Sequence, residues 1–125
     1  GVTRGTGRAE ICRAVLEGVA HCCADVIEVL AVASGTRPGA VRLDGGMSAN
    51  PTFVQALADA SRMVVERSSE VEATALGAAA LARVATGDAA DPADAMEGWQ
   101  PVEIVRPRGP VDRDRWAEAV SRARP

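Results

Sequence analysis

The stretch at residues 41–51, VRLDGGMSANP, limits the possible folds of this chain more than any other. It predicts a short apolar strand, a tight turn at Gly45 and Gly46, and a helix that begins at Asn50. Asparagine is a favoured N-cap residue, and the proline after it suits the first position of a helix. A strand, a glycine turn and a helix start in this order are a common way for an α/β protein to present backbone N–H groups to a phosphate or nucleotide.

On its own, the glycine pair is a weak signal, because such pairs mark many turns that bind nothing. A purely structural turn and a ligand site therefore both stay open at this point. The context favours a ligand site, since Ser48 and Asn50 can hydrogen-bond near the helix N-terminus. The stretch lacks the Gly-Lys-Ser/Thr end of a Walker A loop and the third spaced glycine of a dinucleotide fingerprint.

Around this stretch the sequence predicts a helix-rich α/β fold with few parallel strands flanked by helices. Two strands joined by a helix should be parallel with a right-handed crossover. Residues 99–110 are interrupted by prolines and should form an extended edge or surface segment. The predicted helices are residues 8–34, 51–61, 72–86 and 111–124, and the predicted strands lie at 40–43, within the strand-and-turn unit 40–50, and at 63–66.

The first predicted helix, residues 8–34, has apolar residues at spacings of three and four, so it should have one buried side. Thr6 is its expected N-cap. Gly18 lies in the middle of this helix at a cost of about 1 kcal/mol relative to Ala, so we expect a closely packed neighbour there. The residues predicted to face the core are Ile11, Val15, Gly18, Val19, Cys22, Val26, Leu30 and Ala33, and a different face carries Glu10, Arg13, Glu17, His21, Asp25 and Glu28.

Composition and charge exclude several classes of function. The net charge is −3 and no basic patch with interleaved aromatic residues is present, which argues against a nucleic-acid partner. No apolar run is long enough for a membrane span, and residues 1–10 lack the apolar segment of a signal peptide. The cysteines, Cys12, Cys22 and Cys23, lie on one predicted helix, and an odd count does not suggest a disulfide framework. We therefore expect a cytoplasmic protein.

The sequence contains no Cys/His or Ser/His/Asp arrangement that predicts a metal or catalytic site. Glu70 and Glu72 could serve as catalytic carboxylates, but acids at the start of a helix are the favoured interpretation. His21 is the only histidine, and the two cysteines beside it point in different directions on a helix, so no metal ligand is predicted. A histidine at the boundary of the core is the favoured interpretation. Trp99 and Trp116 are interpreted as anchors of the C-terminal segment, and Asp112 as a cap of the last helix.

Four ordered blocks of the sequence form a pattern. They are residues 13–20 (RAVLEGVA), 43–50 (LDGGMSAN), 57–59 (LAD), and 65–67 (VER) leading to 72–79 (EATALGAA). Together they resemble the C-terminal domain of the FGGY family of sugar and polyol kinases. The Asp-Gly-Gly-Met-Ser-Ala-Asn form of the second block is similar to the glycerol kinase branch of that family more than to the pentulose kinases.

The resemblance implies part of an actin/hexokinase-like (ribonuclease H-like) ATPase fold, in which two domains close around a cleft. It also implies Mg²⁺- and ATP-dependent phosphorylation of a polyol hydroxyl, which in the complete enzyme would convert glycerol and ATP to glycerol 3-phosphate and ADP. In such kinases the turn that matches residues 44–50 lies beside ADP, so the resemblance implies nucleotide-binding roles for Gly45, Gly46 and Asn50. The expected partners are therefore ATP and a small polyol, and a homo-oligomer is also expected.

The resemblance also predicts what this chain lacks. The phosphate loops, the catalytic Asp and the polyol-binding residues of the family belong to earlier sequence, and the chain begins at Gly1 without an initiator methionine. We therefore expect an absent N-terminal domain and an inactive isolated piece. The alternative hypothesis is a non-catalytic α/β module that self-associates through an exposed sheet edge.

Overall fold

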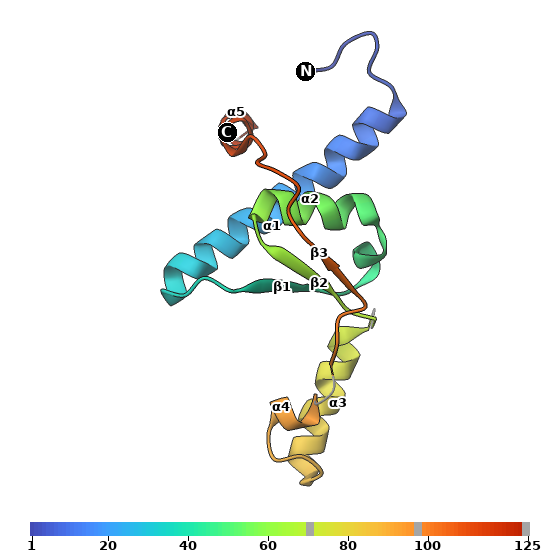
Figure 1. Ribbon diagram of the computed structural model, residues 1–125, viewed down its shortest axis with the longest axis vertical. Helices are drawn as coiled ribbons and strands as arrows, with labels where there is room; N and C mark the ends of the chain where they lie inside the picture. Colours follow the sequence, from blue (N-terminus) through green and yellow to red (C-terminus); the bar gives the residue numbers. More distant parts are fainter. Residues whose placement is uncertain (70–71, 97–98, 124–125) are drawn as a thin grey trace.

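A computed structural model describes residues 1–69, 72–96 and 99–123 of the 125-residue chain. Helix α2 lies across a small sheet, α1 crosses α2, and α3 and α4 extend away from the sheet (Figure 1). Along the chain the described residues form α1 (Arg8–Ser34), β1 (Ala40–Leu43), the 3₁₀ helix η1 (Gly46–Ala49), α2 (Pro51–Ser61), β2 (Val64–Arg67), α3 (Ala73–Thr86), α4 (Pro92–Ala95), β3 (Glu103–Val105) and α5 (Arg113–Ala123).

The bounds of α1, β1 and α2 are those predicted from the sequence. Strand β2 begins one residue later than predicted, because Arg62 ends α2 with a φ of 57° and Met63 completes the turn. Helix α3 begins one residue later, because Glu72 is its N-cap. Helix α5 begins at Arg113 instead of residue 111, because the Asp112 carboxylate accepts a hydrogen bond from the Arg115 N–H. The predicted end of that helix, residue 124, lies outside the described residues.

The sheet contains three strands in the order β1-β2-β3. Strands β1 and β2 are parallel, with Val41 opposite Val65, and α2 forms the crossover between them. The segment predicted to be an edge contributes β3, which pairs with β2 antiparallel, with Val105 opposite Val65. The sheet is therefore mixed. The predicted parallel pair, β1 and β2, comes first along the chain, and β3 adds an antiparallel strand.

Helix α2 supplies most of the hydrophobic core. Its apolar residues recur at the spacing that places them on one helical face, as the sequence predicts. The four residues of this face that belong to the core cluster, Phe53, Val54, Leu57 and Ala58, are each at most 3% exposed. The core cluster consists of Ala20 from α1, Phe53, Val54, Leu57 and Ala58 from α2, and Val65 from β2.

The face of α1 that packs against this core is not the face predicted from the sequence. Leu16, Ala20, Cys23 and Ile27 contact the core cluster or belong to it. The stripe predicted to be buried is displaced by one residue along the helix, which corresponds to a rotation of about 100°. Both faces carry apolar residues at helical spacing, so the periodicity does not distinguish between them. The observed contact places the small Ala20 in the core cluster and Leu16 and Ile27 against it.

The predicted stripe is instead exposed. Ile11, Val15, Val26 and Leu30 are 53%, 61%, 58% and 61% exposed. Isolated apolar residues are normal on a protein surface, but a row of them along one helix marks a surface that can pack against another structure.

Thr6 is not the N-cap of α1, as the sequence predicted. The N-cap is Gly7, whose N–H donates a hydrogen bond of 2.9 Å to the Glu10 carboxylate. The Thr6 hydroxyl oxygen accepts from the Thr3 N–H at 2.9 Å instead, within the turn that precedes the helix. Hydrogen bonds from the backbone of Glu10 and Gly7 lower the pKa of Glu10.

Helix α3 has a single buried residue, Ala80, among its described residues. A Cβ built on Gly77 would have no heavy atom within 4 Å, so nothing in the described part of the chain packs closely on Gly77. No helix among the described residues has both the length and the apolar content that a bilayer-spanning segment requires.

The expected neighbour of Gly18 is Trp116. A Cβ built on Gly18 would lie 3.9 Å from Cζ3 of that ring, which is an ordinary van der Waals distance. Gly18 therefore lies where α5 reaches α1, and there is room for one methyl group but not for a large side chain.

We predict that Gly18→Ala raises the free energy of unfolding by about 1 kcal/mol, because Ala is a better helix former and its methyl group makes an ordinary contact with Trp116. Urea unfolding measures the difference. Gly77→Ala is the matched control, since Gly77 lies mid-helix in α3 without such a neighbour. If the free energy of unfolding rises in Gly77→Ala but falls in Gly18→Ala, the Trp116 contact is too tight for a methyl group.

Candidate functional site

The turn after β1 is fixed by Gly45 and Ser48. Gly45 has a φ of 81° and a ψ of 175°, a conformation that is open to essentially only glycine. Its carbonyl oxygen accepts two hydrogen bonds from Ser48, one from the hydroxyl at 2.7 Å and one from the N–H at 3.0 Å. The buried Ser48 thus closes the turn onto Gly45, two residues after the end of β1.

Asn50 is the N-cap of α2, as the sequence predicts. Its Oδ1 accepts hydrogen bonds from the N–H groups of Thr52 at 3.0 Å and Phe53 at 3.2 Å. Pro51 has no N–H, and the Val54 N–H donates to the Asn50 carbonyl oxygen. The N-terminus of α2 is therefore satisfied by the chain itself, and the part of Asn50 left for a ligand is the Nδ2 amino group.

The free backbone donors lie one turn earlier. Within the part of the chain that the structure describes, the N–H groups of Gly45, Gly46 and Met47 have no hydrogen-bond partner. Gly46 and Met47 are exposed, and a Cβ built on Gly46 would meet no atom within 4 Å. Consecutive backbone N–H groups without a partner in the chain are donors that an anion can use.

The structure brings the three predicted site residues together on one short segment. Gly45 sets the turn, Gly46 opens the surface beside it, and Asn50 closes the segment at the start of α2. The adjoining strand residue Arg42 lies with its guanidinium 4.1 Å from the ring centroid of Trp99 and forms an ion pair with Glu66. Trp99 therefore ties the C-terminal segment to β1 next to the turn, in agreement with its predicted anchoring role.

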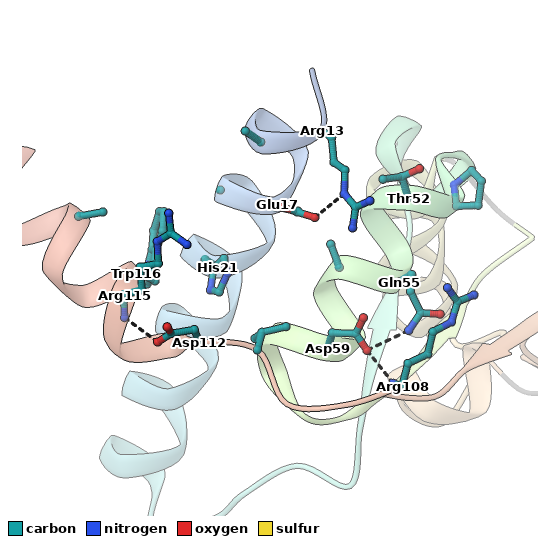
Figure 2. A pocket seen from close by; sticks show the side chains of 16 residues that line it. Arg13, Glu17, His21, Thr52, Gln55, Asp59, Arg108, Asp112, Arg115 and Trp116 are labelled. Atoms are coloured by element: carbon teal, nitrogen blue, oxygen red, sulfur yellow. Dashed lines mark hydrogen bonds and ion pairs between the residues drawn. The ribbon is translucent and has the colours of Figure 1, made fainter. Parts of the chain in front are cut away.

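A groove of about 860 Å³ lies elsewhere, between α1, α2, α5 and the segment that leads into α5 (Figure 2). None of Gly45, Gly46 and Asn50 lines it, although the next residues, Pro51 and Thr52, do. The groove is thus separate from the predicted nucleotide turn.

The carboxylates of this groove are bound to donors of the chain. Glu17 pairs with Arg13 at 2.7 Å. Asp59 accepts from the Gln55 side chain at 3.0 Å and from the Arg108 N–H at 2.7 Å, as Figure 2 shows. These contacts join the walls of the groove. Each carboxylate that lines the groove among the described residues therefore has a donor from the chain, since Asp112 accepts from the Arg115 N–H. Among the described residues, no group of three or more His, Cys, Asp and Glu side chains is arranged to hold a metal ion.

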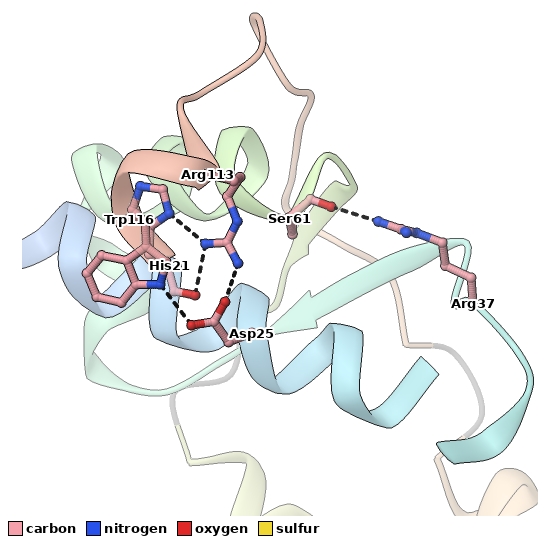
Figure 3. A network of polar contacts seen from close by, with 6 residues as sticks. All are labelled: His21, Asp25, Arg37, Ser61, Arg113 and Trp116. Carbon is pink, nitrogen blue, oxygen red and sulfur yellow. Dashed lines mark hydrogen bonds and ion pairs between the residues drawn. The ribbon is translucent and has the colours of Figure 1, made fainter. Parts of the chain in front are cut away.

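One wall of the groove is held by a polar network that we call the α5 anchor, formed by His21, Asp25, Arg113 and Trp116 (Figure 3). The Arg113 guanidinium donates to His21 Nδ1 at 2.6 Å, to the His21 carbonyl oxygen at 3.3 Å and to the Asp25 carboxylate. The Trp116 indole N–H donates to the other Asp25 oxygen at 2.8 Å. The Trp116 and His21 rings stack with their centroids 5.0 Å apart.

The α5 anchor shifts the pKa values of both its titratable α1 residues. Burial lowers the pKa of His21, and the neighbouring Arg113 charge lowers it further, against the opposite effect of Asp25 and Glu17. Burial raises the pKa of Asp25, but hydrogen bonds from Trp116 and Arg113 and the Arg113 charge together outweigh burial, so that this pKa lies below its ordinary value.

The sequence alone did not reveal this network. It placed His21 at the edge of the core and used Trp116 as an anchor, and both predictions agree with the structure. It gave no sign of the Asp25 and Arg113 pairing, because these residues are 88 positions apart and neither stands in a recognisable motif.

The comparisons with known proteins define a carbohydrate-kinase domain. The family model described as the FGGY family of carbohydrate kinases, C-terminal domain, matches residues 1–86. The chain therefore belongs to the FGGY family of carbohydrate kinases, as the four sequence blocks indicated.

Curated relatives include the glycerol kinase of Rhodospirillum rubrum, which is 41% identical over 127 residues covering 98% of this chain and 26% of that protein. The glycerol kinase of Rhodopirellula baltica is 40% identical over 99% of this chain and 24% of that protein. The chain thus spans about a quarter of the length of the curated relatives that it matches.

Solved structures show the same fold. Glycerol kinase from Plasmodium falciparum with ADP matches with a TM-score of 0.70 and 28% identity, over 97% of this chain and 24% of that chain. A xylulose kinase from Brucella ovis matches with a TM-score of 0.74 and 27% identity, over 98% of this chain and 25% of that chain. The predicted fold class, α/β and part of an actin/hexokinase-like ATPase domain, is confirmed.

We predict that Gly45→Ala destabilises the fold by about 1–3 kcal/mol, because a Cβ is strained at a φ of 81° and ψ of 175°. Gly46→Ala is the matched control, since Gly46 has no positive φ and its Cβ would meet no atom within 4 Å. Urea unfolding of both variants measures the difference. Equal stability of the two variants would contradict the assignment of the strained turn to Gly45.

Proposed function

We propose that this chain is the nucleotide-binding part of an ATP-dependent polyol kinase, which as the complete enzyme phosphorylates glycerol to glycerol 3-phosphate. The supporting observation is the turn after β1, where three consecutive backbone N–H groups are free, on a chain about 40% identical to glycerol kinases along its length. The similar glycerol kinase structure from Plasmodium falciparum contains ADP. Its name and those of the curated relatives support a nucleotide and a small polyol as the partners.

In the proposed site the nucleotide phosphate approaches the N–H groups of Gly46 and Met47, where the absence of a side chain on Gly46 leaves the surface open. The Nδ2 group of Asn50 supplies a further donor beside it. Gly45 keeps the turn in the conformation that exposes these groups. The chain thus binds and orients the nucleotide and contributes no catalytic residue.

The proposed reaction transfers the γ-phosphoryl group to a polyol hydroxyl. A new bond forms between the hydroxyl oxygen and phosphorus, the bond to the β-phosphate oxygen breaks, and ADP leaves, while the hydroxyl proton passes to a base outside this chain. Mg²⁺ on the nucleotide supplies charge stabilisation in such transfers. We assign Mg²⁺ to the complete enzyme and none of its ligands to this chain.

The exposed stripe on α1 fits this proposal. Ile11, Val15, Val26 and Leu30 are more than half exposed here, and the relatives are about four times longer than this chain. We infer that another part of the same enzyme packs on this stripe. On α3, Gly77 likewise leaves room for a neighbour, since a Cβ built there would meet no atom within 4 Å.

Family membership does not favour the alternative of a non-catalytic, self-associating module. A homo-oligomer and a cytoplasmic location stay predictions for the complete enzyme, as does the absence of nucleic-acid and membrane partners. The isolated chain is expected to have no kinase activity.

We predict that Gly46→Val raises the KM for ATP of the complete enzyme by about tenfold or more, because a branched side chain would block the approach of phosphate to the turn and remove about 1.5–3 kcal/mol of charged hydrogen bonding. Steady-state kinetics with ATP varied measures the change. Gly39→Val is the matched control, since Gly39 also has no positive φ and no atom within 4 Å of its Cβ, but lies before β1. An unchanged KM in Gly46→Val, or an equal rise in Gly39→Val, would refute the site.

We predict that Asn50→Asp weakens ADP binding without loss of stability. Aspartate keeps the oxygen that accepts from Thr52 and Phe53, but it replaces the Nδ2 donor with a charged oxygen that repels phosphate. Isothermal titration calorimetry with ADP measures affinity, and urea unfolding measures stability. Asn50→Ala should lose about 1 kcal/mol of stability through loss of the cap. If Asn50→Asp binds ADP with unchanged affinity, Asn50 caps α2 but does not bind the nucleotide.

A further inference from the structure

Helix α5 is held to α1 by the polar contacts of Arg113 and Trp116 and by the stacking of the Trp116 ring on His21. None of its described residues is buried, and its 11 residues are too few for an isolated helix to be stable in water. Its position therefore depends on the α5 anchor, which joins it to α1 across 88 to 92 positions of sequence.

Arg113 is the centre of the α5 anchor. Its side chain is 17% exposed, and its guanidinium donates to a ring nitrogen, a carbonyl oxygen and a carboxylate of α1 (Figure 3). A guanidinium has only donors, so His21 Nδ1 has to offer a lone pair to it. The bond of 2.6 Å thus requires neutral His21 with its hydrogen on Nε2.

We propose that the α5 anchor is a pH-sensitive latch, in which neutral His21 holds helix α5 on α1 and protonation of His21 releases it. A proton from solvent on Nδ1 would place an N–H group against the Arg113 N–H group that now donates to it. It would also place two cations in contact at a half-buried site. Because Trp116 of α5 stacks on the His21 ring, release of α5 would also separate these two rings.

The other charged groups around His21 do not remove this effect. Glu17 and Asp25 on the same helix favour the protonated ring, but burial and Arg113 outweigh them. The further charged residues that line the groove beside His21 are Arg13 on α1, Asp59 on α2, Arg108 before α5, and Asp112 and Arg115 at the start of α5.

The sign of the pH dependence follows from the lowered pKa of His21. In the released state the ring has an ordinary pKa of about 6.5, and in the latched state the pKa is lower, so release takes up a proton. Docking of α5 is therefore fully favoured above about pH 6.5 and is lost as the pH falls through the lower value. Asp25, whose pKa lies below its ordinary 3.8, stays ionised across this window.

The test uses the protein expressed from its complete reading frame and labelled with 5-fluorotryptophan. The ¹⁹F resonance of Trp116, identified by its loss in Trp116→Phe, is followed between about pH 8 and pH 5, and the His21 ring is followed by ¹H–¹³C NMR. We expect both signals to change with one midpoint below pH 6.5, while the Trp99 resonance stays constant. Different midpoints for the two signals, or a Trp116 resonance that does not change, would overturn the proposal.

Two variants separate the latch from general acid unfolding. His21→Gln keeps an oxygen that can accept from Arg113 but does not titrate, so its Trp116 resonance should stay at the docked position throughout. Arg113→Met should give the released position at every pH. A pH transition in His21→Gln like that of the natural protein, or a docked Trp116 in Arg113→Met, would count against the latch.

Discussion

The burial of helix α2 is the interaction on which the rest of the structure depends. Its four core residues pack against β2 on one side and against Ala20 of α1 on the other. The same helix is the crossover that makes β1 and β2 parallel, and its N-cap, Asn50, is the last residue of the turn that we propose binds nucleotide. The position of the turn is therefore fixed by the core directly, without a flexible link between them.

Most of the elements could be predicted from the sequence, because their signals are local. The Asn-Pro start of α2 and the glycines after α1 and before η1 act within a few residues of themselves. The buried face of α1 could not be predicted, because periodicity gives a stripe but not what it faces. Ile11, Val15, Val26 and Leu30 form the exposed stripe, and the face that packs on the core has Ala20 with Leu16 and Ile27 beside it.

The candidate site was predictable in part for the same reason. The sequence placed Gly45, Gly46 and Asn50 together, and it identified Asn50 as a cap. It suggested that the strand, the glycine turn and the helix start together present N–H groups. In the structure Asn50 occupies those of Thr52 and Phe53 at the helix start, and the free groups are found at Gly45 to Met47. That distribution depends on the φ of Gly45 and on the Ser48 hydrogen bonds, which no residue pattern specifies.

The two halves of Asn50 explain why a structural and a binding role are compatible at this turn. An asparagine side chain has an acceptor and a donor on one rigid plane. The acceptor is used by α2, so the orientation of the donor is set by the helix and does not have to be set by the ligand. Because the Asn50 side chain is already held in place, it loses less conformational entropy when a ligand binds to its donor. The cap therefore prepares the proposed site, and the stability of α2 and the affinity for nucleotide depend on different atoms of the same residue.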